Sequence, residues 1–194
     1  MTTTAHPTEN PTLTVTDEIS VRASLEQTFH SLLVQMGRQN QAPDGSPLPM
    51  VLEPHPGGRW FRDLGGDNGH LWGFVQSIKR PTLLEIWGPL FMSTAATSNL
   101  LYRLRETPEG TLISFRHTVV GPVPEDHRPG LVSGWAALHA RVRAAAEAAS
   151  AAARTQACSA VHPDPSRERW SSGNGPTSVC VNEMTVPSGV SRSR

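Results

Sequence analysis

His117 is the residue with the clearest potential for chemistry. Residues 112–120 alternate as a strand, and His117 shares a face with Ile113, Phe115 and Val119. Its imidazole should therefore point into a core or a cavity, where burial favours the neutral ring with one donor and one acceptor. Three interpretations stay open: a core histidine satisfied by a neighbour, a ligand contact, or a general acid or base.

Two further pairs combine an aromatic ring with a polar group. Trp60 shares a strand face with Arg62, and His70 shares one with Trp72. Either pair can line the mouth of a pocket, with the indole providing shape and the arginine or histidine selecting a polar end. The alternative is that the tryptophans fill the core, while Arg62 lies exposed or pairs with Asp63.

The complete set of predicted ligand-binding residues adds large apolar side chains that suit a pocket wall. Each of them has core packing as its alternative role. The set is Trp60, Arg62, His70, Trp72, Trp87, Phe91, Met92, Tyr102, Phe115, His117 and Trp135.

Other chemistries find little support in the sequence. His55, His70, His117 and His139 fall on different predicted elements, so we predict no metal site and no cofactor. The glycine-rich residues 65–69 precede no helical pattern and lack the lysine of a phosphate-binding loop, which favours a hairpin turn. No nucleophile elbow and no basic stripe with interleaved aromatics is present, so neither a serine hydrolase nor a nucleic-acid partner is predicted.

The elements that must position these residues are mainly strands. Turn-formers divide residues 54–92 into short runs rich in aromatic and branched side chains, which is typical of consecutive antiparallel strands. The pattern predicts strands over residues 13–23, 50–53, 59–64, 70–79, 83–87, 97–106 and 112–120. In the first of these, Asp17 interrupts the apolar face and indicates a bulge or a sheet edge.

Two stretches have helical periodicity. Ser24 and Gln27 form a capping-box pattern ahead of an apolar stripe that ends near Gly37. Residues 38–48 read as a loop without a packing signal. A long helix is predicted from about Leu131, with a buried stripe that includes Trp135 and Leu138.

These elements predict one domain over residues 12–153. Residues 1–11 are expected to be a flexible arm. Residues 154–194 are rich in Ser, Pro, Gly and Arg and are expected to be disordered, because they cannot bury enough apolar surface to offset their ordering entropy.

Composition narrows the class of protein further. The 194 residues carry 17 basic and 17 acidic side chains, so no net field attracts nucleic acid or acidic lipid. The two cysteines form no disulfide framework, and no apolar run is long enough for a membrane span. The start lacks the features of a secretion signal. We therefore expect a soluble, bacterial-type cytoplasmic protein.

Several short motifs occur in a characteristic order. They are Pro56-Gly57-Gly58-Arg59-Trp60, then Gly73-Phe74-Val75 leading to Pro81 and Leu83-Leu84-Glu85, and finally Gly134-Trp135. In this order they resemble the START-like (SRPBCC, Bet v 1-like) superfamily over about residues 12–150. Within it, the chain is most similar to the branch named for the C-terminal-like domain of the activator of heat-shock protein 90 ATPase.

The resemblance implies an α+β helix-grip fold, in which a curved antiparallel sheet wraps around a long C-terminal helix and leaves a cavity. It implies a domain that binds a hydrophobic or amphipathic small molecule. Two alternatives stay open: a cyclase- or hydrolase-type enzyme that uses His117, His70, Arg62 or Glu53, and a stress-related protein-interaction domain with a protein partner.

Overall fold

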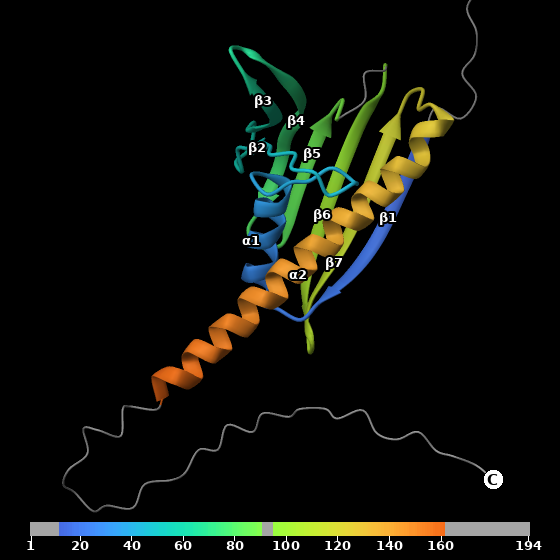
Figure 1. Ribbon diagram of the computed structural model, residues 1–194. Helices are drawn as coiled ribbons and strands as arrows, with labels where there is room; N and C mark the ends of the chain where they lie inside the picture. Colours follow the sequence, from blue (N-terminus) through green and yellow to red (C-terminus); the bar gives the residue numbers. More distant parts are fainter. Residues whose placement is uncertain (1–11, 91–94, 162–194) are drawn as a thin grey trace, which may run out of the picture. The chain divides into compact units, whose positions relative to one another are not determined.

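A computed structural model describes residues 12–90 and 95–161 of the chain (Figure 1). Two α-helices, one short 3₁₀ turn and seven strands follow one another along these residues. The strands are β1 (Thr12–Val21), β2 (Val51–Leu52), β3 (Arg59–Gly65), β4 (Asn68–Lys79), β5 (Leu83–Gly88), β6 (Thr97–Thr107) and β7 (Gly110–Val120). The helices are α1 (Leu25–Met36) and α2 (Arg128–Val161), and the turn η1 (Glu125–His127) precedes α2.

The strands form one curved antiparallel sheet in the order β1-β7-β6-β5-β4-β3-β2. Both α1 and α2 lie on the same face of this sheet (Figure 1). The helix-grip architecture predicted from the sequence is confirmed.

Tight turns connect the long strands, as the sequence predicts. Gly66 and Asp67 join β3 to β4, and both have positive φ angles, 58° and 63°. That geometry suits a two-residue hairpin turn, whose twist matches the twist of the strands. Pro108 and Glu109 join β6 to β7. The two hairpins bring residues of neighbouring strands into direct register.

Local sequence also sets the start of α1. The Ser24 side chain accepts from the Gln27 backbone N–H, and the Gln27 side chain accepts from the Ser24 backbone N–H. This capping box satisfies donors that the first turn leaves without intrahelical partners. Gly37 follows as the C-cap, so both predicted ends of α1 are confirmed.

Helix α2 is longer than predicted at both ends. It begins at Arg128 because Pro129 falls in the first turn, where its missing N–H costs no hydrogen bond. It continues to Val161, so the prediction of disorder was wrong for residues 154–161. This part of the chain still contains good helix formers. The rest of the predicted tail and the predicted arm lie outside the described residues.

The chain divides into two units, residues 1–152 and 153–194. The domain boundary predicted at residue 153 therefore lies within a helix. No helix among the described residues has the length and apolar character needed to cross a membrane.

The core of the first unit lies between the sheet and its two helices. The α1 side chains Leu25, Phe29, Leu32 and Met36 are buried there. Helix α2 contributes four apolar side chains to the same core cluster, Trp135, Leu138, Val142 and Ala146, and its Leu131 and His139 are buried as well. Alternate residues of β5, β6 and β7 meet them from the sheet. The apolar faces that the helical and strand periodicities predict thus pack against each other.

Candidate functional site

A pocket of about 250 Å³ opens between α2, the β3–β4 hairpin and the segment that follows α1. Three tryptophans line it: Trp60 from β3, Trp72 from β4 and Trp135 from α2. Leucines at positions 48, 131 and 138 add aliphatic surface. Asn40, Gln41 and Arg141 supply the polar side chains of the lining. The pocket lining is therefore mainly apolar, with a few polar groups.

Buried contacts connect the wall made by β3 and β4 to the rest of the fold. Trp60 is 1% exposed, and its indole N–H donates to the Met36 carbonyl at 2.8 Å, which joins β3 to the end of α1. Trp72 meets it edge-on, with ring centroids 5.0 Å apart. Gly73 lies opposite Trp60, and a Cβ there would approach the Trp87 carbonyl to 2.6 Å. Glycine at this position lets the neighbouring strands meet closely beneath the two indoles.

Trp72 reaches the pocket through a β-bulge. The register pairs Trp60 with Gly73 and Phe61 with Leu71, so Trp72 is the extra residue on β4. Bulges commonly redirect a side chain in this way. Simple alternation along β4 therefore did not determine its direction.

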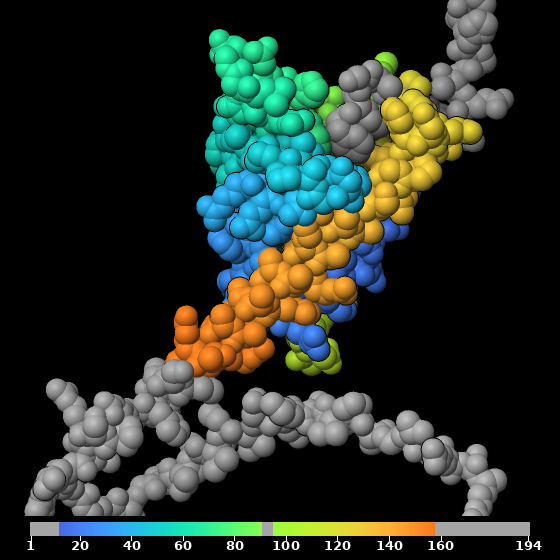
Figure 2. Space-filling model, in the orientation of Figure 1, coloured from blue at the N-terminus to red at the C-terminus, as the bar shows by residue number. Residues whose placement is uncertain are grey.

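The segment between α1 and β2, which the sequence predicts as a loop without a packing signal, forms another part of the wall. Its ends are tied together by the Leu48 N–H, which donates to the Asn40 carbonyl at 2.9 Å. At its tip, the Asp44 carboxylate accepts from the hydroxyl and the backbone N–H of Ser46, which lowers the pKa of Asp44. Figure 2 shows this segment, in cyan, lying against α2.

Arg141 is the charged residue of the pocket lining. One terminal nitrogen, Nη2, donates to the Gln41 carbonyl at 3.3 Å, while Nε is shielded from solvent and has no hydrogen-bond partner among the described residues. Burial lowers the pKa of Arg141 below its usual value. The guanidinium stays protonated at neutral pH, so the pocket lining holds a positive charge.

His117 lies beside the pocket and not in its lining. It is fully buried, and its Nδ1 accepts from the Trp135 indole N–H at 3.0 Å. Burial lowers the pKa of His117 from 6.5 to about 4, so the neutral ring carries its proton on Nε2. That Nε2 has no partner among the described residues. His117 thus orients a pocket tryptophan, as a buried neutral histidine.

A second arrangement, in which the histidine and the tyrosine are buried, connects three elements. His139 of α2 donates from Nδ1 to the Asp17 carboxylate of β1 at 2.8 Å, and its Nε2 lies 3.2 Å from the Tyr102 hydroxyl of β6. With Asp17 ionised, Nε2 accepts from Tyr102. Burial lowers the pKa of His139, although Asp17 opposes this, and burial raises the pKa of Tyr102 well above 10.

The sequence interpretation missed this Asp17–His139–Tyr102 chain. One signal was present, because Asp17 interrupts an otherwise apolar strand face. The register of β1 with β7 is continuous through Asp17, so the interruption marks no bulge; β1 is an edge strand, and Asp17 pairs with a helix histidine. His139 also follows Trp135 by four residues, which places both on one side of α2.

Four other predicted site residues lie outside the pocket lining, two in the core and two on the β3–β4 hairpin. Phe115 packs within the core against Trp135, Tyr102 and His139, with centroid distances of 4.9, 4.7 and 4.7 Å. Tyr102 is equally buried and is not in the pocket lining. Arg62 and His70 are direct cross-strand neighbours on the β3–β4 hairpin, outside the lining.

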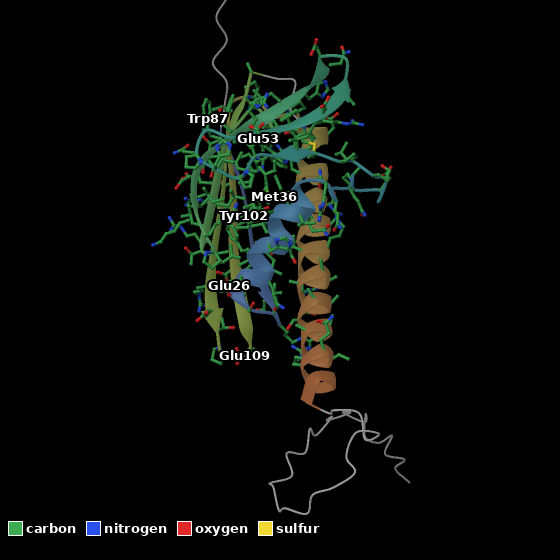
Figure 3. All side chains as sticks on the ribbon, turned by 90° about the vertical axis from the view of Figure 1, so that its left-hand side faces the viewer. Glu26, Met36, Glu53, Trp87, Tyr102 and Glu109 are labelled. Carbon is green, nitrogen blue, oxygen red and sulfur yellow. The ribbon has the colours of Figure 1, made fainter. Side chains whose placement is uncertain are left out.

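Trp87 does not line this pocket. Its side chain is 47% exposed and packs on Phe74, with ring centroids 5.7 Å apart. Figure 3 shows it on the side of the sheet away from α2. Leu84, Ile86 and Gly88 are the buried residues of β5, so alternation along the strand turns Trp87 outward. Phe91 and Met92 lie outside the described residues.

The pocket lining offers few groups for acid–base chemistry. Among the described residues that line it, none is a histidine, an aspartate or a glutamate. Glu53, a candidate in the enzyme hypothesis, instead pairs with Arg59 at 2.6 Å, and the hydrogen bonds from Arg59 lower the pKa of Glu53 to about 2. Within the described part of the chain, no group of three or more His, Cys, Asp or Glu side chains is arranged to hold a metal ion.

Comparison with known proteins reveals similarity at the level of the fold. No family model matches the chain, and no curated protein matches it. A solved structure of protein CV1439 from Chromobacterium violaceum has a TM-score of 0.56 at 12% identity, covering 69% of this chain and 96% of that one.

Two further solved structures have slightly lower TM-scores. Ara h 8.0201 has a TM-score of 0.52 at 12% identity, covering 69% of this chain and 96% of its own. An uncharacterized protein from Rhizobium leguminosarum has a TM-score of 0.52 at 16% identity, with 68% and 94% covered. At these identities the likeness establishes architecture alone, so the chain has the Bet v 1-like helix-grip fold.

Proposed function

We propose that the protein binds a hydrophobic or amphipathic small molecule in the pocket between the sheet and α2. The observation that carries this proposal is the convergence of Trp60, Trp72 and Trp135 on a cavity of about 250 Å³. Three indoles and three leucines present apolar surface that a ligand would remove from water, at roughly 25 cal/mol per Å² of apolar area.

Direct binding measurements test the proposal. Isothermal titration against lipids, sterols and polyketide-like aromatics should yield at least one saturable ligand, with a negative heat-capacity change from apolar burial. Failure of every compound class to bind or to raise the melting temperature would contradict the proposal.

A variant that fills the pocket tests whether the ligand binds there or elsewhere on the surface. Gly134 lines the pocket, and a Cβ there would meet the Pro43 ring at an ordinary 3.8 Å. Gly134→Leu should therefore fold and weaken ligand binding at least about tenfold by occupying the space. Ala140→Leu, at an exposed position of the same helix, is the matched control and should leave the dissociation constant unchanged.

The alternatives have less support. A cyclase or hydrolase needs a general acid or base at the cavity, and the described lining contains no histidine or carboxylate. An interaction domain stays a prediction that a pull-down from native extract would test. The cytoplasmic location and the place within the branch of the heat-shock protein 90 ATPase activator also remain predictions from the sequence.

A further inference from the structure

Arg141 has an unusual position for a surface helix residue. It contributes to the lining of the apolar pocket and also to a neighbouring polar groove formed with Gln35, Arg38 and Gln39. Its Nη2 donates to the Gln41 carbonyl at 3.3 Å. Among the described residues, no carboxylate forms an ion pair with it: Glu53 and Glu147 pair with other arginines, and Asp17 with His139.

The guanidinium therefore has unused capacity to bind. A partly buried charge is costly unless it is paired, and a shielded donor without an acceptor adds to that cost. Arg141 Nε is such a donor. A carboxylate seated in the pocket would place an opposite charge beside the guanidinium of Arg141, which is part of the lining. Because a guanidinium presents two parallel N–H groups, a planar carboxylate is its best geometric match.

We propose that the ligand of this pocket is an amphipathic carboxylate, whose apolar body lies between the tryptophans and whose carboxylate binds Arg141. This inference rests on the proposed function and narrows it to one class of ligand. Arg141 is the one charged side chain in the described lining, so a single negative charge is balanced there. Asn40 and Gln41 lie in the same lining, where amide groups favour a polar head over a hydrocarbon end.

Three matched ligands test the charge preference in the unmodified protein. These are 2-naphthoic acid, 2-naphthamide and naphthalen-2-ylmethylammonium, which share one ring system and differ in charge. Isothermal titration at pH 7 should give the acid about 10- to 100-fold tighter binding than the amide, and the ammonium the weakest binding.

A matched pair of variants assigns the preference to Arg141. Arg141→Gln should lower the affinity for the acid to that for the amide, while the affinity for the amide stays unchanged. Arg143→Gln, at an exposed position two residues further along α2, should keep the wild-type preference. Arg141→Lys keeps the positive charge but loses the paired N–H donors of the guanidinium, so it should retain part of the preference for the acid over the amide.

The outcomes distinguish the two proposals. Equal affinity of the full-length protein for acid and amide overturns the carboxylate inference and leaves the binding function in place. Equal weakening of both ligands by Arg141→Gln overturns it as well, because the residue would then act through pocket shape. Binding of none of the three ligands, together with failure of the broader panel, overturns the binding function and this inference with it.

Discussion

At the scale of single residues, His117 shows how burial changes the chemistry of a side chain. A fully buried imidazole could serve as a base, but its Nδ1 is already occupied by the Trp135 indole N–H. Its lowered pKa keeps the ring neutral over the physiological range. His117, the strongest candidate for chemistry in the sequence, thus orients the pocket residue Trp135 and does not itself line the pocket.

This burial predicts a loss of stability in acid. The unfolded chain binds a proton at His117 near pH 6.5, whereas the folded chain does so only at about pH 4. The free energy of unfolding should therefore fall as the pH drops from 6.5 to 4, with His117 accounting for about 3 kcal/mol. The lowered pKa of His139 acts in the same direction.

Urea denaturation of His117→Gln at pH 7 and pH 4 measures this contribution. Glutamine can still accept from Trp135 but does not titrate, so the variant should lose about 3 kcal/mol less than the wild type over this interval. His30→Gln, at an exposed position of α1, should retain the wild-type loss. Identical losses in all three proteins would contradict a buried neutral His117.

At the scale of elements, the attachment of α2 to the sheet depends on Trp135. Its ring packs on Phe115 and His117, at centroid distances of 4.9 and 5.5 Å, and stacks along the helix over His139. The chain Asp17–His139–Tyr102 adds a polar connection from the same helix to β1 and β6. One turn of α2 thus combines apolar packing with directional hydrogen bonds.

Two tryptophan truncations measure this attachment. Trp135→Ala removes a ring that is 6% exposed and should cost about 3–5 kcal/mol of unfolding free energy. Trp87→Ala removes a ring that is 47% exposed and should cost about 1 kcal/mol or less. Denaturant titration of both variants makes the comparison, and similar costs would contradict the placement of the two rings.

At the scale of the whole molecule, the folded core ends before the predicted boundary at residue 153. Ala146 is the last residue of the core cluster, and the described side chains of residues 151–157 are exposed. Deletion of residues 154–194 should therefore change the free energy of unfolding by less than about 1 kcal/mol.

Deletion of residues 145–194 is the contrasting truncation. It removes Ala146, which is fully buried, and Glu147, which pairs with Arg22. Thermal and urea denaturation should show a clear loss for this shorter chain alone. A loss of several kcal/mol in the longer chain would show that residues beyond 153 belong to the core.

The fold was predictable because its signals are local. Alternation, hairpin turns and the Ser24–Gln27 capping box each depend on residues close in sequence, and each appears in the structure. The inward direction of His117 followed from alternation alone.

The site was less predictable because its contacts are distant. Asp17 and His139 are separated by 122 positions, and Gln41 and Arg141 by 100. No periodicity connects such pairs. The direction of the Trp72 side chain depends on a β-bulge, which alternation does not predict. Asn40 and Leu48 line the pocket from a segment whose polar composition gives no sign of packing.

The wall between α1 and β2 has a consequence for how this protein can diversify. That segment contributes to the pocket lining, and only its end joins the core: Leu48 packs against the core cluster and Met50 belongs to it, while the rest of the cluster comes mainly from strands and helices. Surface connections tolerate changes in length and sequence far better than packed interiors do. Related chains can therefore acquire new chemical preferences by exchanging about ten residues, while the scaffold that carries them keeps its stability.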